Sequence, residues 1–118
     1  MAIAATTLTL AASCGITSTS ITVLPVGDAS RGADLFVAGC ATCHGAEGGG
    51  TETGPPLVDS TYRSGHHSDA AFLLAVRQGV RPHHWSFGAM PSIPDITDQA
   101  IADIVAHVRG LQSAAGIE

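Results

Sequence analysis

The segment Cys40-Ala41-Thr42-Cys43-His44 decides how the rest of this chain is interpreted. It places two thiols three positions apart, and an imidazole follows the second thiol directly. Three kinds of site use cysteines at this spacing: a haem attachment site, a redox-active dithiol and a zinc site. The residues around the segment distinguish these uses.

The C-x-x-C-H pattern is typical of covalent haem attachment. Two thiols at this spacing can each add to one vinyl group at the same porphyrin edge, which holds the adjacent His44 at the iron as a ligand. A redox-active C-x-x-C follows a strand, whereas a helical segment precedes this one. A zinc site would combine Cys40, Cys43 and His44 with His66 or His67. We therefore predict one covalently attached haem c per chain.

The composition suits a small domain that depends on a cofactor. Of the 118 residues, 45% are hydrophobic but only 4% are aromatic, so few large side chains are available for a core. Domains of this size often depend on a metal, a disulfide or a cofactor for stability. The net charge is −5 and all five basic residues are arginines. This charge predicts no nucleic-acid partner, and it predicts redox partners with basic docking surfaces.

Three segments have the pattern of amphipathic helices, at residues 29–39, 69–78 and 98–112. Each is preceded by a side chain suited to cap its first turn: Asp28, Ser68 and Thr97. The third segment has an apolar stripe formed by Ile101, Ile104, Val105, Val108 and Leu111. Residues 45–56 and 80–94 are rich in glycine and proline and are predicted loops. The chain is therefore expected to form a single all-α domain.

Met90 is the expected second iron ligand. The chain has two methionines, and the other is Met1. A thioether suits haem iron and raises the reduction potential relative to two imidazoles. Two alternatives stay open at this point: Met90 only fills a gap in the core, or another histidine binds the iron. Those other candidates are His66, His67, His83 and His84.

Residues 1–26 are expected to form an extension that precedes a domain at residues 27–118. Its first twelve residues are apolar and uncharged, like the hydrophobic region of a secretory signal, but they lack the usual positive charge. The nearby Cys14 follows small residues, as a lipidated cysteine does in a bacterial lipoprotein. No apolar run reaches about 18 residues, so no ordinary membrane-spanning helix is expected. We predict a periplasmic or otherwise extracytoplasmic location, and the sequence leaves open a membrane anchor at Cys14.

In their order and spacing these features resemble the class I cytochrome c family, in its small bacterial single-haem form. The resemblance covers residues 27–112. Its motifs are Gly32-x-x-x-Phe36, Cys40 to His44, Gly54-Pro55-Pro56-Leu57, Gly88-Ala89-Met90-Pro91 and the last helix. It implies the cytochrome c fold, in which three to four short helices wrap around one covalently bound haem.

The resemblance also implies how the first and last helices pack. They should cross where Gly32 permits close approach. Gly32 and Phe36 should then contact three residues of the last helix: Ile104, Val105 and Val108. This chain has His107 where the family commonly has an aromatic residue, and it lacks the lysine ring that basic relatives use for docking.

Three further residues are expected at the haem. The resemblance implies that the backbone carbonyl of Pro55 accepts a hydrogen bond from His44 Nδ1, which would fix the ring orientation, and that Leu57 lines the pocket. Trp85 is expected to donate its indole N–H to a haem carboxylate while burying its ring. The cationic side chains in this region that could also donate to a haem carboxylate are Arg63, Arg77 and Arg81.

These features predict an electron carrier between redox partners outside the cytoplasm, and not an enzyme. An iron bound by His44 and Met90 has no open position for a substrate. One alternative is the cytochrome subunit of a membrane-associated oxidoreductase. A second is a gas-binding or sensing haem domain in which Met90 dissociates.

Overall fold

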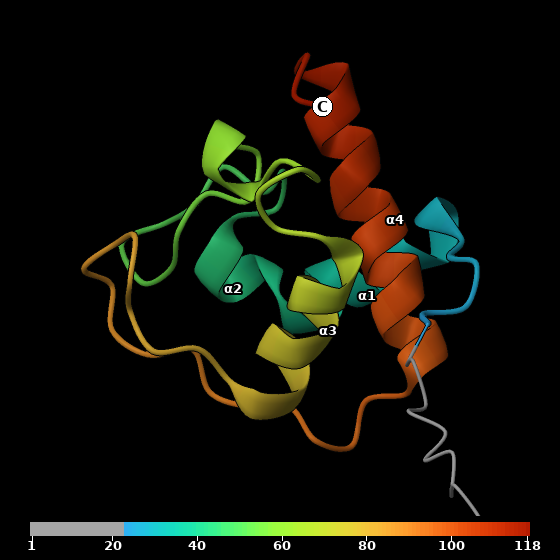
Figure 1. Ribbon diagram of the computed structural model, residues 1–118, viewed down its shortest axis with the longest axis horizontal. Helices are drawn as coiled ribbons and strands as arrows, with labels where there is room; N and C mark the ends of the chain where they lie inside the picture. Colours follow the sequence, from blue (N-terminus) through green and yellow to red (C-terminus); the bar gives the residue numbers. More distant parts are fainter. Residues whose placement is uncertain (1–22) are drawn as a thin grey trace, which may run out of the picture.

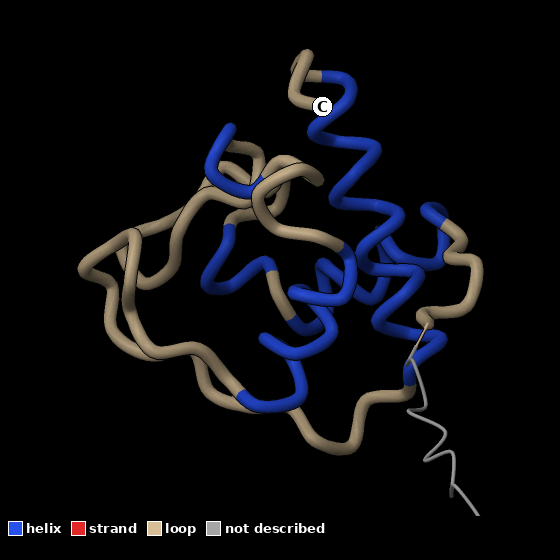
Figure 2. The backbone as a smooth tube through the Cα atoms, viewed as in Figure 1, coloured by secondary structure: helices blue, strands red, loops and turns tan. Residues whose placement is uncertain are grey.

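The computed structural model describes residues 23–118, which form helices joined by long loops (Figures 1 and 2). The elements are α1 (Ala29–Gly39), α2 (Ala41–His44), the 3-10 helix η1 (Ser60–Tyr62), α3 (Asp69–Gln78) and α4 (Asp98–Ala114). No strand occurs in residues 23–118, where one isolated bridge pairs Val80 with Met90. The predicted all-α class is therefore confirmed.

The three long helices begin at the predicted residues, and two of the three caps form as expected. The Asp28 side chain accepts hydrogen bonds from the backbone N–H groups of Ser30 and Arg31. The Thr97 side chain accepts from the N–H of Ala100. Ser68 occupies the cap position of α3, but its side chain makes no capping hydrogen bond. The start of α3 therefore depends on its backbone and packing more than on its cap.

Helices α1 and α4 cross at close range, with α1 passing behind α4 in Figure 1. A Cβ atom on Gly32 would lie 1.9 Å from the backbone oxygen of Asp103, so only glycine permits this approach. Beside it, Phe36 is fully buried in one cluster with Ile104 and Val108. His107 also packs on Phe36, with ring centroids 5.4 Å apart.

The expectation that Val105 packs against Gly32 and Phe36 of α1 is corrected by the structure. Val105 belongs to a second cluster, in which it packs with Leu73 of α3 and Ile101 of α4. Successive residues of a helix point about 100° apart. Ile104 therefore lies on the face of α4 that packs on α1, and Val105 lies on the face that packs on α3.

Asp103 is a buried charge at the crossing, with only 2% of its surface exposed. Its carboxylate accepts hydrogen bonds from Arg31 Nε at 3.0 Å and from the backbone N–H of Asp28 at 2.7 Å. Gln99 donates to the same carboxylate. These donors, the Arg31 side chain first among them, lower the pKa of Asp103 to about 2. The carboxylate therefore stays ionised and joins the start of α1 to the middle of α4.

Two long loops complete the domain. We call residues 45–59 the His44 loop and residues 79–97 the Met90 loop. Figure 2 draws both in tan, and the Met90 loop runs on to the start of α4. The sequence predicted both loops but missed α2 and η1, which are too short to carry a periodic pattern.

The described part of the chain begins within the expected extension. Leu24 packs against the cluster formed by Leu73, Ile101 and Val105, and Gln99 donates to the backbone oxygen of Val26. Among residues 23–118, no helix has the length and apolar content needed to cross a membrane. The predicted export signal and the predicted lipid site at Cys14 lie outside the described residues.

Candidate functional site

One pocket brings together the residues expected to attach the haem, to bind its iron and to line its site. Its walls come from α1, α2, α3, α4 and both long loops, and most of its lining is apolar. The seven expected residues that line it are Cys40, Cys43, His44, Pro55, Leu57, Trp85 and Met90. A large flat apolar cofactor with polar attachment points would therefore fit this pocket.

The cysteines lie at the junction of α1 and α2. The N–H of Cys40 closes α1 by donating to the backbone oxygen of Phe36, and Cys43 lies one turn later in α2. Cys40 is half-buried and Cys43 is exposed. Burial, with a smaller effect of the neighbouring Cys43 thiol, raises the pKa of Cys40. The pair therefore spans the pocket wall from the interior to the surface.

The imidazole of His44 is fixed by the His44 loop. Its Nδ1 lies 2.9 Å from the backbone oxygen of Pro55, which is the contact that the family resemblance implies. A carbonyl can only accept, so Nδ1 carries the proton and Nε2 is the nitrogen free to bind a metal. The backbone oxygen of His44 also accepts from the N–H of Gly50 at 2.7 Å. Ring and backbone are thus both held in place, as a proximal iron ligand requires.

The chain after His44 is folded tightly over α2. The Thr51 hydroxyl donates to the backbone oxygen of Cys43 at 2.7 Å. A Cβ atom on Gly54 would lie 2.6 Å from that same oxygen. Gly54 therefore has to be a glycine for the loop to approach α2 closely enough to bring Pro55 to His44.

Met90 is positioned by its own backbone. Its N–H and C=O exchange hydrogen bonds with Val80, at 2.9 and 3.0 Å. Gly79 has φ +74°, and a Cβ atom there would lie 2.6 Å from the Met90 oxygen. These contacts tie Met90 to the end of α3, so its side chain reaches the pocket from the Met90 loop.

Trp85 lines the pocket as expected, but its hydrogen bond in this structure goes elsewhere. Its indole N–H donates to the Tyr62 hydroxyl at 3.1 Å. The hydroxyl of Tyr62 was missed by the sequence analysis, and burial raises its pKa. Of the arginines considered as donors, Arg81 lines the pocket, whereas Arg77 binds Pro94 and Asp98.

Two side chains of α4 hold the pocket wall, and the sequence analysis missed both. Gln112 is 2% exposed and donates to the backbone oxygens of Leu57 and Tyr62, at 2.8 and 3.1 Å. Arg109 donates to the backbone oxygens of Tyr62 and His67. The available signal was that Gln112 lies four positions after Val108, on the buried stripe of α4.

Four histidines lie together near this pocket. His67, His83 and His84 line it, and His66 packs on both His67 and His84. Partial desolvation of its ring, followed by repulsion from the three neighbouring imidazoles, lowers the pKa of His84. The zinc alternative had placed His66 or His67 with the cysteines, whereas the structure groups both of them with His84.

Comparisons with known proteins point to one family. The family model described as Cytochrome c matches residues 29–112, which is most of the chain. A curated relative named "Cytochrome c" from Theileria parva is 43% identical over 51 residues. That match covers 42% of this chain and 44% of the relative, so the chain spans less than half the length of that relative.

The family match and the pocket agree. The matched segment contains both cysteines, His44 and Met90, and the pocket that they line is apolar and supplies an imidazole with a free Nε2. Electron transfer through a covalently attached haem c is the general role of this family. The chain therefore belongs to the cytochrome c family, as a class I cytochrome c with covalently attached haem c as its cofactor.

Proposed function

We propose that this protein carries single electrons between redox partners outside the cytoplasm, with haem attached at Cys40 and Cys43 and iron bound by His44 and Met90. The observation that carries this proposal is that both ligand candidates line one pocket while their backbones are anchored by separate loops. When bound, haem iron supplies reversible one-electron chemistry. The residues of the chain supply ligation, orientation and exclusion of water.

Anchoring of both ligands favours electron transfer over gas binding. The Pro55 carbonyl fixes the ring of His44, and Val80 fixes the backbone of Met90. Ligands held in both oxidation states need little rearrangement when the electron moves, and they leave no open position for a gas molecule. The exposed Cys43 places the attachment edge at the surface, where a partner can approach.

Absorption spectra of a ligand variant test the ligation. The protein should show low-spin c-type bands when reduced and the weak far-red sulfur-to-iron band when oxidised. Met90→Ala should lose the far-red band and bind carbon monoxide rapidly when reduced. Ile93→Ala is the matched control, because Ile93 also lines the pocket from the Met90 loop. A Met90→Ala protein that keeps the far-red band would overturn the assignment.

The charge of the chain supports partners with basic docking surfaces. Ten acidic residues oppose five arginines, and there is no lysine. Electron-transfer rates with a basic partner should therefore fall as ionic strength rises. A rate that rises with salt would contradict this choice of partner.

The signal-like residues 1–12 support a location outside the cytoplasm, and Cys14 supports a second arrangement as the subunit of a membrane-associated oxidoreductase. Intact-mass measurement of the native protein distinguishes the two, because it reports haem, cleavage and lipid together. A lipid on Cys14 and co-purification with a larger complex would favour the subunit. A monomer that begins near Val26 without lipid would favour the free carrier.

A further inference from the structure

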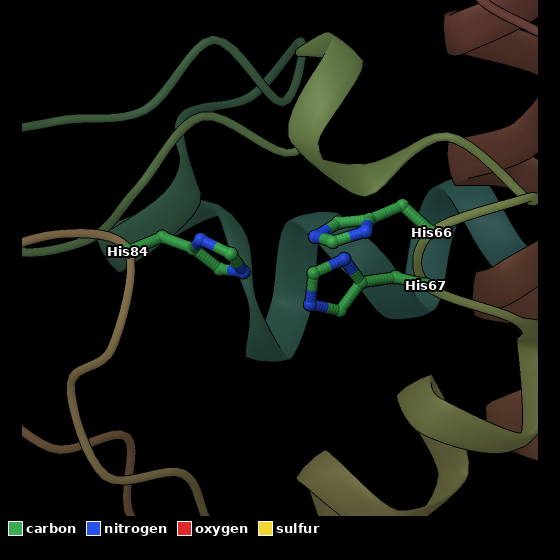
Figure 3. A group of neighbouring side chains, drawn as sticks. All are labelled: His66, His67 and His84. Atoms are coloured by element: carbon green, nitrogen blue, oxygen red, sulfur yellow. The ribbon is translucent and has the colours of Figure 1, made fainter.

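We propose that His66, His67 and His84 form a binding site for a divalent transition metal such as Zn²⁺, separate from the iron ligands. Figure 3 shows His84 pointing from the Met90 loop toward His66 and His67, which lie side by side before α3. One ligand nitrogen from each ring lies within 4.8 Å of the other two. Three imidazoles from two separate segments thus converge on one point.

The spacing is close to that of a bound metal. Zn²⁺ binds imidazole nitrogen at about 2.0–2.1 Å in a tetrahedron, which places two ligand nitrogens about 3.4 Å apart. Small side-chain rotations would close the observed spacing to this value. His66 and His84 are exposed and free to rotate, while His67 is half-buried and fixed. The site therefore has one fixed ligand and two adaptable ones.

His67 is already oriented as a metal-binding histidine. Its Nδ1 lies 2.7 Å from the backbone oxygen of Thr61, so Nδ1 carries the proton and Nε2 presents its lone pair. Thr61 is itself held, because its N–H donates to the Asp59 side chain at 2.8 Å. An imidazole whose second nitrogen donates to a backbone carbonyl is the usual arrangement around bound zinc.

The fourth ligand position has a local candidate. The rings of His83 and His84 have centroids 4.3 Å apart, and His83 Nδ1 lies 3.0 Å from the backbone oxygen of Arg81. His83 or a water molecule would complete the tetrahedron. The lowered pKa of His84 keeps its ring neutral and able to bind a metal. A metal here would join the Met90 loop to the segment before α3.

Zinc titration of the haem-loaded protein tests the site. Zn²⁺ is redox-inert, so it does not exchange electrons with the haem. After treatment with a chelator, calorimetry at neutral pH should show one Zn²⁺ per chain. His66→Gln and His84→Gln should each weaken binding about tenfold or more, and the double variant should lose it. His66 is exposed and does not line the haem pocket, so His66→Gln should keep the haem spectrum and the melting temperature measured with chelator present.

His107→Gln is the control, because it removes a histidine that packs on Phe36, outside the cluster. It should bind zinc like the parent protein. In the reduced, diamagnetic protein, zinc should also shift the ring proton resonances of His66, His67 and His84. The proposal is overturned if the parent protein shows no saturable binding, or if the double variant binds zinc as the parent does. Either result would leave the iron ligands and the proposed electron transfer unaffected.

Discussion

The two loops that line the haem pocket are held in different ways. The His44 loop is held from the interior: buried Gln112 binds the backbone oxygen of Leu57, and the N–H of Leu57 donates to the oxygen of Gly48. The Met90 loop is held by a short bridge to Val80 and by Arg77, a side chain nearer the surface. We infer that the His44 end is the more rigid of the two, and that Met90 is the ligand that releases first.

The largest effect is expected when the His44 loop is strained directly. Gly50 has φ +82°, and a Cβ atom there would lie 2.7 Å from the backbone nitrogen of Pro56. Gly50→Ala should lower the free energy of unfolding by about 3 kcal/mol, because conformational strain and a backbone clash add. Chemical denaturation of the haem-loaded protein measures this.

A glycine of the other loop, the Met90 loop, separates the effect of backbone strain from the effect of a steric clash. Gly88 has φ +92°, but a Cβ atom there would have no neighbour within 4 Å. Gly88→Ala should therefore cost only about 1 kcal/mol. If Gly50→Ala and Gly88→Ala lowered the free energy of unfolding equally, the close packing of the His44 loop would contribute nothing to the difference.

The next prediction compares the two side chains that anchor the loops, Gln112 for the His44 loop and Arg77 for the Met90 loop. Gln112→Leu should cost about 2 kcal/mol, because it leaves the carbonyl of Leu57 without this buried donor. Arg77→Ala should cost less than about 1 kcal/mol, since its contacts with Pro94 and Asp98 lie near the surface. Thermal unfolding of both variants gives the comparison. If Arg77→Ala proved the more damaging, the proposed difference between the loops would be reversed.

A smaller effect should appear as a difference between two unfolding midpoints. If the Met90 loop opens first, the far-red band of the oxidised protein should disappear at lower denaturant than the helical circular dichroism. Both signals can be followed in one guanidinium titration. Coincident transitions would mean that Met90 releases only when the whole domain unfolds.

Two further effects are expected from pH, with chelator present to exclude metal. The folded pKa of His84 is lowered, so stability should fall as pH drops through about 6.5, the unfolded value, toward the folded pKa. The carboxylate of Asp103 has a folded pKa of about 2, so its contribution is present above about pH 4 and is lost between about pH 4 and 2. His84→Gln should reduce the first change only, and Asp103→Asn the second only. Melting temperatures measured across pH test both.

The helices could be predicted from the sequence because their signals are local. Asp28 and Thr97 cap the helices that follow them, and α4 has an apolar stripe. Gln112 and Arg109 could not be assigned, because they bind backbone oxygens more than 40 positions away in the chain. The histidine cluster was hidden for the same reason: His84 meets His66 and His67 only after the loops fold.

The contact between Arg31 and Asp103 also bears on how this domain assembles. The two residues are 72 positions apart, and most of the pocket is formed by the chain between them. Closing a loop of that length is entropically costly, but the cost grows only slowly with length. Once this cost has been met, the two contacts that position the ligand candidates, His44 with Pro55 and Val80 with Met90, join residues only 10 or 11 positions apart. Folding should therefore be limited by docking of the two ends of the domain, and a chain that stops before α4 should leave the haem-attachment segment without its pocket.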